Sequence, residues 1–169
     1  REQGAEIMPF SPLNDEAPKT DCDAVFLPGG YPELNAEKLA RCRNFLAGVR
    51  QAAASGAFVY GECGGFMVLG ESLIDADGKR HEMAGLLPLT TSFAQRSLHL
   101  GYRRIALLAE TPFARTGTLL TGHEFHYSNL IETGDAAAPL FQAVDARGKD
   151  LGAYGMISGN VAGSYLHLI

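Results

Sequence analysis

The stretch GAFVYGECGGFMVLG, from Gly56 to Gly70, places a cysteine inside a glycine-rich turn. The apolar run Ala57–Tyr60 is typical of a buried strand, and the apolar residues after the turn favour a short helix. The turn Gly61–Gly65 fits the G-x-nucleophile-x-G elbow, with cysteine in place of serine. Glycines suit such an elbow because its backbone is strained and its neighbours pack too closely for a Cβ. The stretch therefore predicts a strand, a sharp turn with Cys63 at its tip, and a helix.

The residues before this elbow predict a parallel unit. Asp23–Leu27 is an apolar run closed by Pro28-Gly29-Gly30, a pattern typical of a strand buried on both faces. A helix is expected to follow, with Asn35 as its N-cap and Gly56 at its C-terminal end. The apolar residues between these two positions recur at helical spacing. Strand, helix, strand and helix in this order imply a parallel sheet with right-handed crossovers.

The two ends of the chain and its second half give further expectations. Gly4 is a plausible C-cap for a preceding helix, and Ala5–Met8 is expected to be a strand. Later strands are expected over 98–108, 118–131, 154–157 and 161–166, with a turn at 158–160 between the last two. The fold class is therefore α/β, with a mixed, mostly parallel central sheet flanked by helices.

Composition bounds the partners and the compartment. A chain of 169 residues with net charge −5 fits one domain and argues against nucleic acid, which needs a clustered basic face. The apolar runs are too short for a membrane span. Cys22, Cys42 and Cys63 form neither a disulfide framework nor a zinc knuckle, so a reducing, cytoplasmic location is expected. The ends do not read as domain boundaries, which suggests a piece of a longer polypeptide.

Two glycine turns are expected to meet at one edge of the sheet, because both follow strands of the parallel unit. The helix after Cys63 presents its positive end to the sulfur, which predicts a lowered pKa for this thiol. The Gly64 N–H, together with that of Gly29 or Gly30, could form an oxyanion hole. These features predict a nucleophilic cysteine.

A cysteine nucleophile needs a base, and the chain has five histidines. His167 follows the predicted strand Ala162–Leu166 and could reach Cys63 at the same edge. His81 and His99 are expected to be surface or satisfied residues. His123 and His126 are one residue short of the H-E-x-x-H spacing and would face opposite sides of a strand, so no metal site is expected.

Five blocks of sequence together point to a family. They are 28–33 (PGGYPE), 60–67 (YGECGGFM), 100–103 (LGYR), 122–128 (GHEFHYS) and 164–167 (SYLH). From about Phe10 to its last residue the chain resembles the glutaminase domains of cobyrinic and hydrogenobyrinic acid a,c-diamide synthases. These domains belong to the flavodoxin-like class I (triad-type) glutamine amidotransferases.

The resemblance implies roles for individual residues. Cys63 corresponds to the nucleophile and His167 to its partner base. Gly30 and Gly64 correspond to the oxyanion donors. The residues implied near the glutamine pocket are Gly29, Glu124 and His126.

One position departs from the triad pattern of class I enzymes. Where many of them carry a glutamate two residues after the histidine, this chain has Ile169. A Cys–His dyad is expected for the cobyrinate branch. The group that orients His167 therefore stays open, with Glu124 and a backbone carbonyl as candidates.

The resemblance also implies partners. Ammonia from glutamine would pass to an N-terminal ATP-binding domain that amidates a corrinoid, with or without cobalt. No cofactor is expected in this domain; ATP and Mg²⁺ belong to the absent one, whose G-x-x-x-x-G-K-[S/T] motif does not occur here. The alternatives are the glutaminase of another amidotransferase such as cobyric acid synthase, a γ-glutamyl peptidase on the same fold, and a non-catalytic assembly domain.

Overall fold

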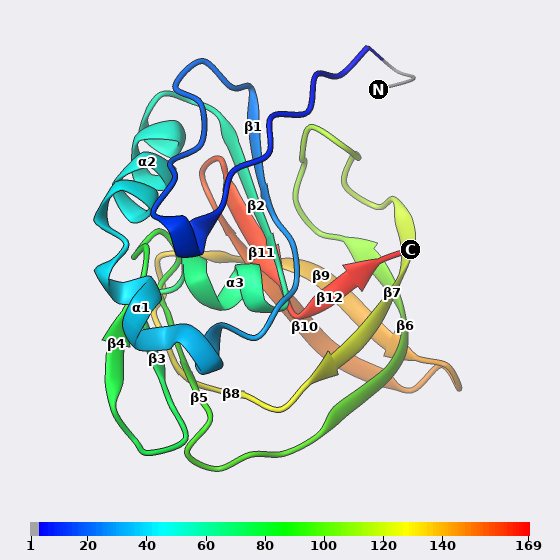
Figure 1. Ribbon diagram of the computed structural model, residues 1–169. Helices are drawn as coiled ribbons and strands as arrows, with labels where there is room; N and C mark the ends of the chain where they lie inside the picture. The colour runs from blue at the N-terminus through cyan, green and yellow to red at the C-terminus, as the bar shows by residue number, and fades with distance from the viewer. Residues whose placement is uncertain (1–3) are drawn as a thin grey trace.

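The computed structural model describes residues 4–169, as a main sheet, a smaller sheet and a layer of helices (Figure 1). The main sheet has the strand order β1 (Ala24–Leu27), β2 (Phe58–Glu62), β11 (Val161–Ser164), β10 (Asp150–Ser158), β9 (Ala138–Asp145), β6 (His99–Leu107), β7 (Leu119–His126) and β12 (Leu166–Leu168). The smaller sheet has the order β4 (Arg80–Glu82), β3 (Ser72–Ile74), β5 (Leu89–Ser92) and β8 (Asn129–Thr133). The helical segments are η1 (Pro12–Asn14), η2 (Pro32–Asn35), α1 (Ala36–Arg41), α2 (Arg43–Ala54) and α3 (Gly64–Leu69).

The α/β class and the mixed sheet are confirmed, but the expectation of a mostly parallel sheet is wrong. Strand β2 pairs in parallel with β1 and β11, and every later pairing across the main sheet is antiparallel. A parallel pair needs a long crossover, which α1 and α2 supply between β1 and β2. Short turns join β9, β10 and β11, and they permit only antiparallel neighbours.

Two cores lie on opposite faces of the main sheet. One joins β1 and β2 to the helices through buried residues such as Val25, Val59 and Phe66. The other, around Ile105 and Phe141, lies inside the curl that the sheet makes between β2 and β6. In Figure 1 the helices lie on the side of β1 and β2, away from β6 and β7. The strand ends that carry the site are thus fixed from both faces.

Several predicted elements differ in extent. The segment 118–131 is not one strand but two, β7 and β8, which belong to different sheets. The helix after Asn35 is broken at Cys42, whose ψ of 75° is not helical, and the Asn35 side chain makes no capping hydrogen bond. Gly56 does follow the helix, with a φ of 95°. The turn predicted at 158–160 joins β10 and β11.

Two expectations near the N-terminus are wrong. Strand β1 is not buried on both faces: it is an edge strand with alternating burial, and Phe26 is 54% exposed. Ala5–Met8 is not a strand, because it pairs with no neighbouring strand in the described residues and leaves Ile7 exposed. The helix expected to end at Gly4 would fall on residues outside the described range.

Candidate active site

The elbow around Cys63 forms as the sequence predicts. Cys63 joins β2 to α3 with φ 47° and ψ −106°, a conformation that side-chain-bearing residues rarely adopt. Its N–H donates to the Ser164 carbonyl oxygen at 2.8 Å, and its own carbonyl accepts the Met67 N–H at 3.1 Å. A Cβ on Gly65 would lie 2.0 Å from the Leu27 oxygen. The turn is therefore held by close backbone packing, and it aims the cysteine outward from the end of β2.

Cys63 opens into a cavity of about 290 Å³ at the carboxyl ends of β1 and β2. The loop after β1 supplies Gly29 and Gly30, β12 supplies His167, and β7 supplies His126. Gly64 packs against this loop, where an added Cβ would lie 2.8 Å from the Gly30 nitrogen. The cavity is lined by Gly29, Gly30, Tyr31, Glu33, Cys63, Met67, Phe93, Phe125, His126, Tyr127 and His167.

The structure thus brings most of the predicted site residues together. Cys63, His167 and the glycines of both turns meet at one edge of the sheet, although Cys63 and His167 are far apart in the sequence. Glu124 is the exception, because its side chain does not line the cavity. The site is therefore assembled by the pairing of β2 with β11 and by the position of β12 after it.

The carboxylate nearest to His167 belongs to Glu62, which the sequence reading missed. Its Oε2 lies 3.5 Å from His167 Nδ1, and its Oε1 accepts the Leu168 N–H at 3.2 Å. A Cβ on Gly29 would lie 2.4 Å from His167 Cε1, so the imidazole rests on the bare Cα of this glycine. The available signal was an acidic residue directly before Cys63, inside the elbow itself.

The suggestion that Glu124 orients His167 is wrong. Glu124 Oε2 accepts hydrogen bonds from Arg103 Nε at 2.9 Å and from the Tyr154 hydroxyl at 3.3 Å, and Arg103 Nη2 lies 2.7 Å away. Its Oε1 lies 2.9 Å from His126 Nε2. His167 pairs with His123, the neighbour of Glu124 on β7, and side chains alternate along a strand. The Glu124 carboxylate therefore points away from His167.

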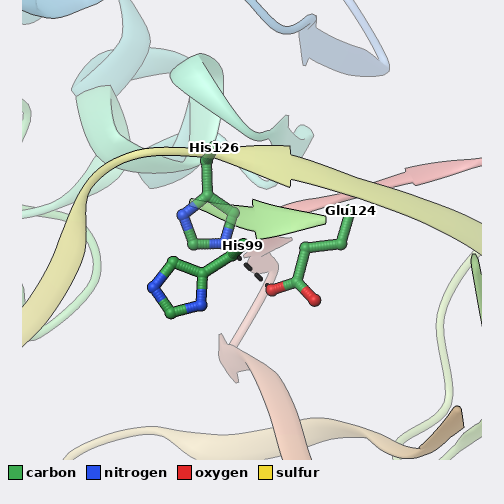
Figure 2. Close-up of side chains that lie close together, drawn as sticks. All are labelled: His99, Glu124 and His126. Carbon is green, nitrogen blue, oxygen red and sulfur yellow. Dashed lines mark hydrogen bonds and ion pairs between the residues drawn. The ribbon is translucent and has the colours of Figure 1, made fainter. Parts of the chain in front are cut away.

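His99, Glu124 and His126 cluster beside the cavity, and Figure 2 shows their side chains drawn together from β6 and β7. The two imidazoles are stacked, with centroids 4.5 Å apart and planes 7° from parallel. Lone pairs in nearly parallel planes do not converge on one ion, and Arg103 already occupies Glu124. The Arg103–Glu124 ion pair and the stacked imidazoles join β6 to β7, and the geometry of the cluster does not suit a metal.

Charge and burial act in opposite directions on Glu124. Burial raises the pKa of Glu124, but the hydrogen bond from His126 and the charges of His126 and Arg103 together outweigh it. The pKa of Glu124 therefore lies below its ordinary value. His126 is buried, and its Nδ1 lies 2.9 Å from the Ser128 carbonyl oxygen. Both ring nitrogens of His126 are thus occupied within the protein, so this pocket candidate shapes the wall of the cavity.

The pKa of the Cys63 thiol is raised, not lowered as the helix dipole suggested. Burial is the largest cause, and the charges of Glu33 and Glu62 add to it, while the backbone hydrogen bond from Gly64 opposes it. Helix α3 has six residues, so its dipole lowers the pKa of Cys63 only slightly. Cys63 is 7% exposed, and its desolvation raises the pKa by more. The raised pKa favours the thiol form of Cys63 at neutral pH.

Alkylation of Cys63 by iodoacetamide is expected to accelerate steadily from pH 7 to pH 9, because thiolate is the reactive form and its fraction rises with pH below the raised pKa. Mass spectrometry of the Cys63 peptide at each pH measures this rate. A Cys63→Ser variant assigns the adduct. A rate that is constant from pH 6 upward would contradict the raised pKa.

Sequence comparisons identify the family of the chain. Residues 1–169 match the family described as CobB/CobQ-like glutamine amidotransferase domain. The chain is 57% identical over 169 residues to the hydrogenobyrinate a,c-diamide synthase of Rhizobium meliloti and 54% identical to that of Brucella anthropi. It is covered completely in both comparisons, but it spans 38% of the length of each relative.

A comparison with solved structures supports the fold. The structure of PurLQS from Thermotoga maritima superposes with a TM-score of 0.58 at 19% identity, covering 90% of this chain and 71% of that one. Among the described helices, none is long and apolar enough to cross a membrane. The elbow, the cavity and the full-length match agree, and the chain belongs to the CobB/CobQ-like glutamine amidotransferase domain family.

Proposed function

We propose that this domain hydrolyses glutamine at Cys63 and supplies ammonia to a larger protein. In that protein, ammonia would replace hydroxyl on the a and c carboxylates of hydrogenobyrinic or cobyrinic acid, in an ATP-dependent step of cobalamin biosynthesis. The observation that carries the proposal is Cys63 at a strained elbow, in one cavity with His167 and with Gly29 and Gly30 of the other glycine turn. The names of the relatives support hydrogenobyrinic acid as the substrate of the larger protein. A cytoplasmic location is part of the same proposal.

The reaction begins at the thiol. His167 takes the proton of Cys63, and the sulfur attacks the side-chain amide carbon of glutamine to form a tetrahedral oxyanion. The Gly30 and Gly64 N–H groups are the proposed donors to that oxyanion, because the two residues are packed backbone to backbone at the mouth of the elbow. The backbone at these positions needs no reorganisation when charge develops.

The second half of the reaction releases both products. The imidazolium of His167 returns its proton to the departing nitrogen, the C–N bond breaks and ammonia leaves. A water molecule, deprotonated by the same imidazole, then attacks the γ-glutamyl thioester. The C–S bond breaks, glutamate forms and the thiol is restored.

ATP and Mg²⁺ are assigned to the remainder of the larger protein, together with the corrinoid. The sequence has no phosphate-binding G-x-x-x-x-G-K-[S/T] loop. The carboxylate of the His99–Glu124–His126 cluster is paired with Arg103, so the described residues do not fit Mg²⁺ there. Each of these partners is inferred from the relatives and not from this site.

Labelling with 6-diazo-5-oxo-norleucine, a glutamine analogue that alkylates glutaminase nucleophiles, tests the proposal. A single adduct on Cys63, blocked by excess glutamine, is expected on peptide mapping, because the cavity positions only this thiol for attack. Cys22 and Cys42 serve as internal controls, since neither lines the cavity. Labelling of all three thiols, or labelling that glutamine does not block, would overturn the glutaminase function. In the intact protein, amidation of corrinoid carboxylates other than a and c would point to the cobyric acid synthase alternative.

A further inference from the structure

We propose that Glu62 positions His167 and fixes its tautomer, taking the place of the carboxylate that is missing after the histidine. This inference rests on the proposed glutaminase function and adds a residue to it. Glu62 precedes the nucleophile directly, so the elbow would carry both the attacking thiol and the group that prepares its base.

Two contacts link Glu62 to the segment that carries His167. Oε2 lies 3.5 Å from His167 Nδ1, and Oε1 accepts the Leu168 N–H at 3.2 Å. One carboxylate therefore holds both the imidazole and the backbone next to it. The side chain of Glu62 is 12% exposed, whereas that of His167 is 35% exposed. The fixed partner is thus the buried acid, and the ring at the mouth of the cavity is the part that needs orientation.

The contact decides which ring nitrogen carries the proton. A carboxylate only accepts hydrogen bonds, so Nδ1 facing Glu62 holds the proton in the neutral imidazole. Nε2 is then left with its lone pair, and among the described residues it has no hydrogen-bond partner. Gly29 supports the Cε1 edge between the two nitrogens. The free lone pair is what His167 needs to take the thiol proton.

The groups around Glu62 act on its pKa in opposite directions. Burial is the largest cause and places the pKa of Glu62 above its ordinary value, although the Leu168 N–H and His167 lower it. Its charge in turn raises the pKa of Cys63, as does that of Glu33. Loss of the Glu62 charge therefore favours the Cys63 thiolate, although it removes the support of the base. These opposite effects separate a positioning role from a general loss of structure.

Glu62→Gln keeps the size of the side chain, but its amide cannot accept hydrogen bonds at both positions as the carboxylate does. If its amide oxygen accepts the Leu168 N–H, its NH₂ group faces His167 Nδ1 and places the ring proton on Nε2. That tautomer cannot accept the proton of Cys63. We expect kcat for glutamine hydrolysis to fall about 10- to 100-fold in the intact protein, with KM changed less than about threefold.

Three further measurements distinguish the role. Nitrogen-15 NMR of labelled histidine is expected to show the His167 proton on Nδ1 in the parent protein and on Nε2 in Glu62→Gln. The Glu62→Asp variant, which keeps the charge with a shorter reach, should recover part of the lost kcat. Alkylation of Cys63 by iodoacetamide at pH 8 should be as fast as in the parent or faster. Glu132→Gln, which removes an ion-paired carboxylate on β8 outside the cavity, is the control and should leave kcat within about twofold.

The outcomes separate the inference from the function on which it rests. A parent protein that does not hydrolyse glutamine overturns the proposed function. An active parent with an equally active Glu62→Gln variant and an unchanged His167 tautomer overturns the positioning role alone. A parallel loss of kcat and of Cys63 alkylation in Glu62→Gln, without rescue by Glu62→Asp, would show a structural role and also overturn it.

Discussion

Cys63→Ala is expected to lower glutamine-dependent amidation by the intact protein about 10⁴-fold or more, while ammonium salts still support the same product. The sulfur is the only atom in the proposed mechanism that bonds to the substrate carbon, so no neighbouring group can replace it. The product of amidation, measured by liquid chromatography with glutamine or with ammonium chloride as nitrogen donor, gives both rates. The ammonia-dependent rate serves as the control for folding, because it needs the rest of the protein but not the thiol.

The matched control replaces a cysteine outside the cavity. Cys42 is buried between α1 and α2, and its thiol donates to the Lys38 carbonyl oxygen at 3.2 Å. Cys42→Ala is expected to cost some stability but to leave both nitrogen donors effective. Glutamine-dependent amidation that survives in Cys63→Ala would refute the assignment of the nucleophile. Loss of both activities in that variant would refute the separation of the glutaminase step from the ammonia-using step.

Gly65→Ala is expected to reduce the free energy of unfolding by more than about 3 kcal/mol. Its Cβ would lie 2.0 Å from the Leu27 carbonyl oxygen and 2.6 Å from the Leu27 carbonyl carbon, which are backbone atoms of β1 and cannot rotate away. The packing of α3 on β1 would have to open to accept one methyl group. Alanine has about 1 kcal/mol better helix propensity than glycine, so any loss of stability must come from this contact. Urea unfolding followed by circular dichroism measures the change.

Gly30→Ala provides the comparison at the same edge of the sheet. A Cβ at Gly30 meets nothing within 4 Å, and the backbone there has an ordinary φ. Its free energy of unfolding should therefore stay within about 1 kcal/mol of the parent. If Gly65→Ala were as stable as Gly30→Ala, close packing at the elbow would not be the reason for its glycines.

Much of the fold could be read from local pattern. The elbow, strands β1 and β2 and the turn at 158–160 were predictable because apolar runs and glycine turns are properties of neighbouring residues. The predicted strand 161–166 was wrong in extent, because it divides into β11, which pairs with β2, and β12, which pairs with β7. The division of 118–131 between β7 and β8 was not predictable from that pattern. It depends on which strands pair with each half, and the partners β6 and β5 lie elsewhere in the chain. The prediction of a mostly parallel sheet was wrong for the same reason, since pairing direction follows from connections across the whole chain.

The sequence by itself determined which groups are candidates for the site: a cysteine at a strained turn, a histidine late in the chain, and the glycines that let two backbones meet. The tertiary structure alone decided how those groups are tuned. Burial of Cys63 reverses the expected direction of its pKa, because desolvation depends on everything packed around the sulfur. The same packing places Glu62 against His167 and turns Glu124 away, since the face that a strand residue presents is known only when its neighbours are in register.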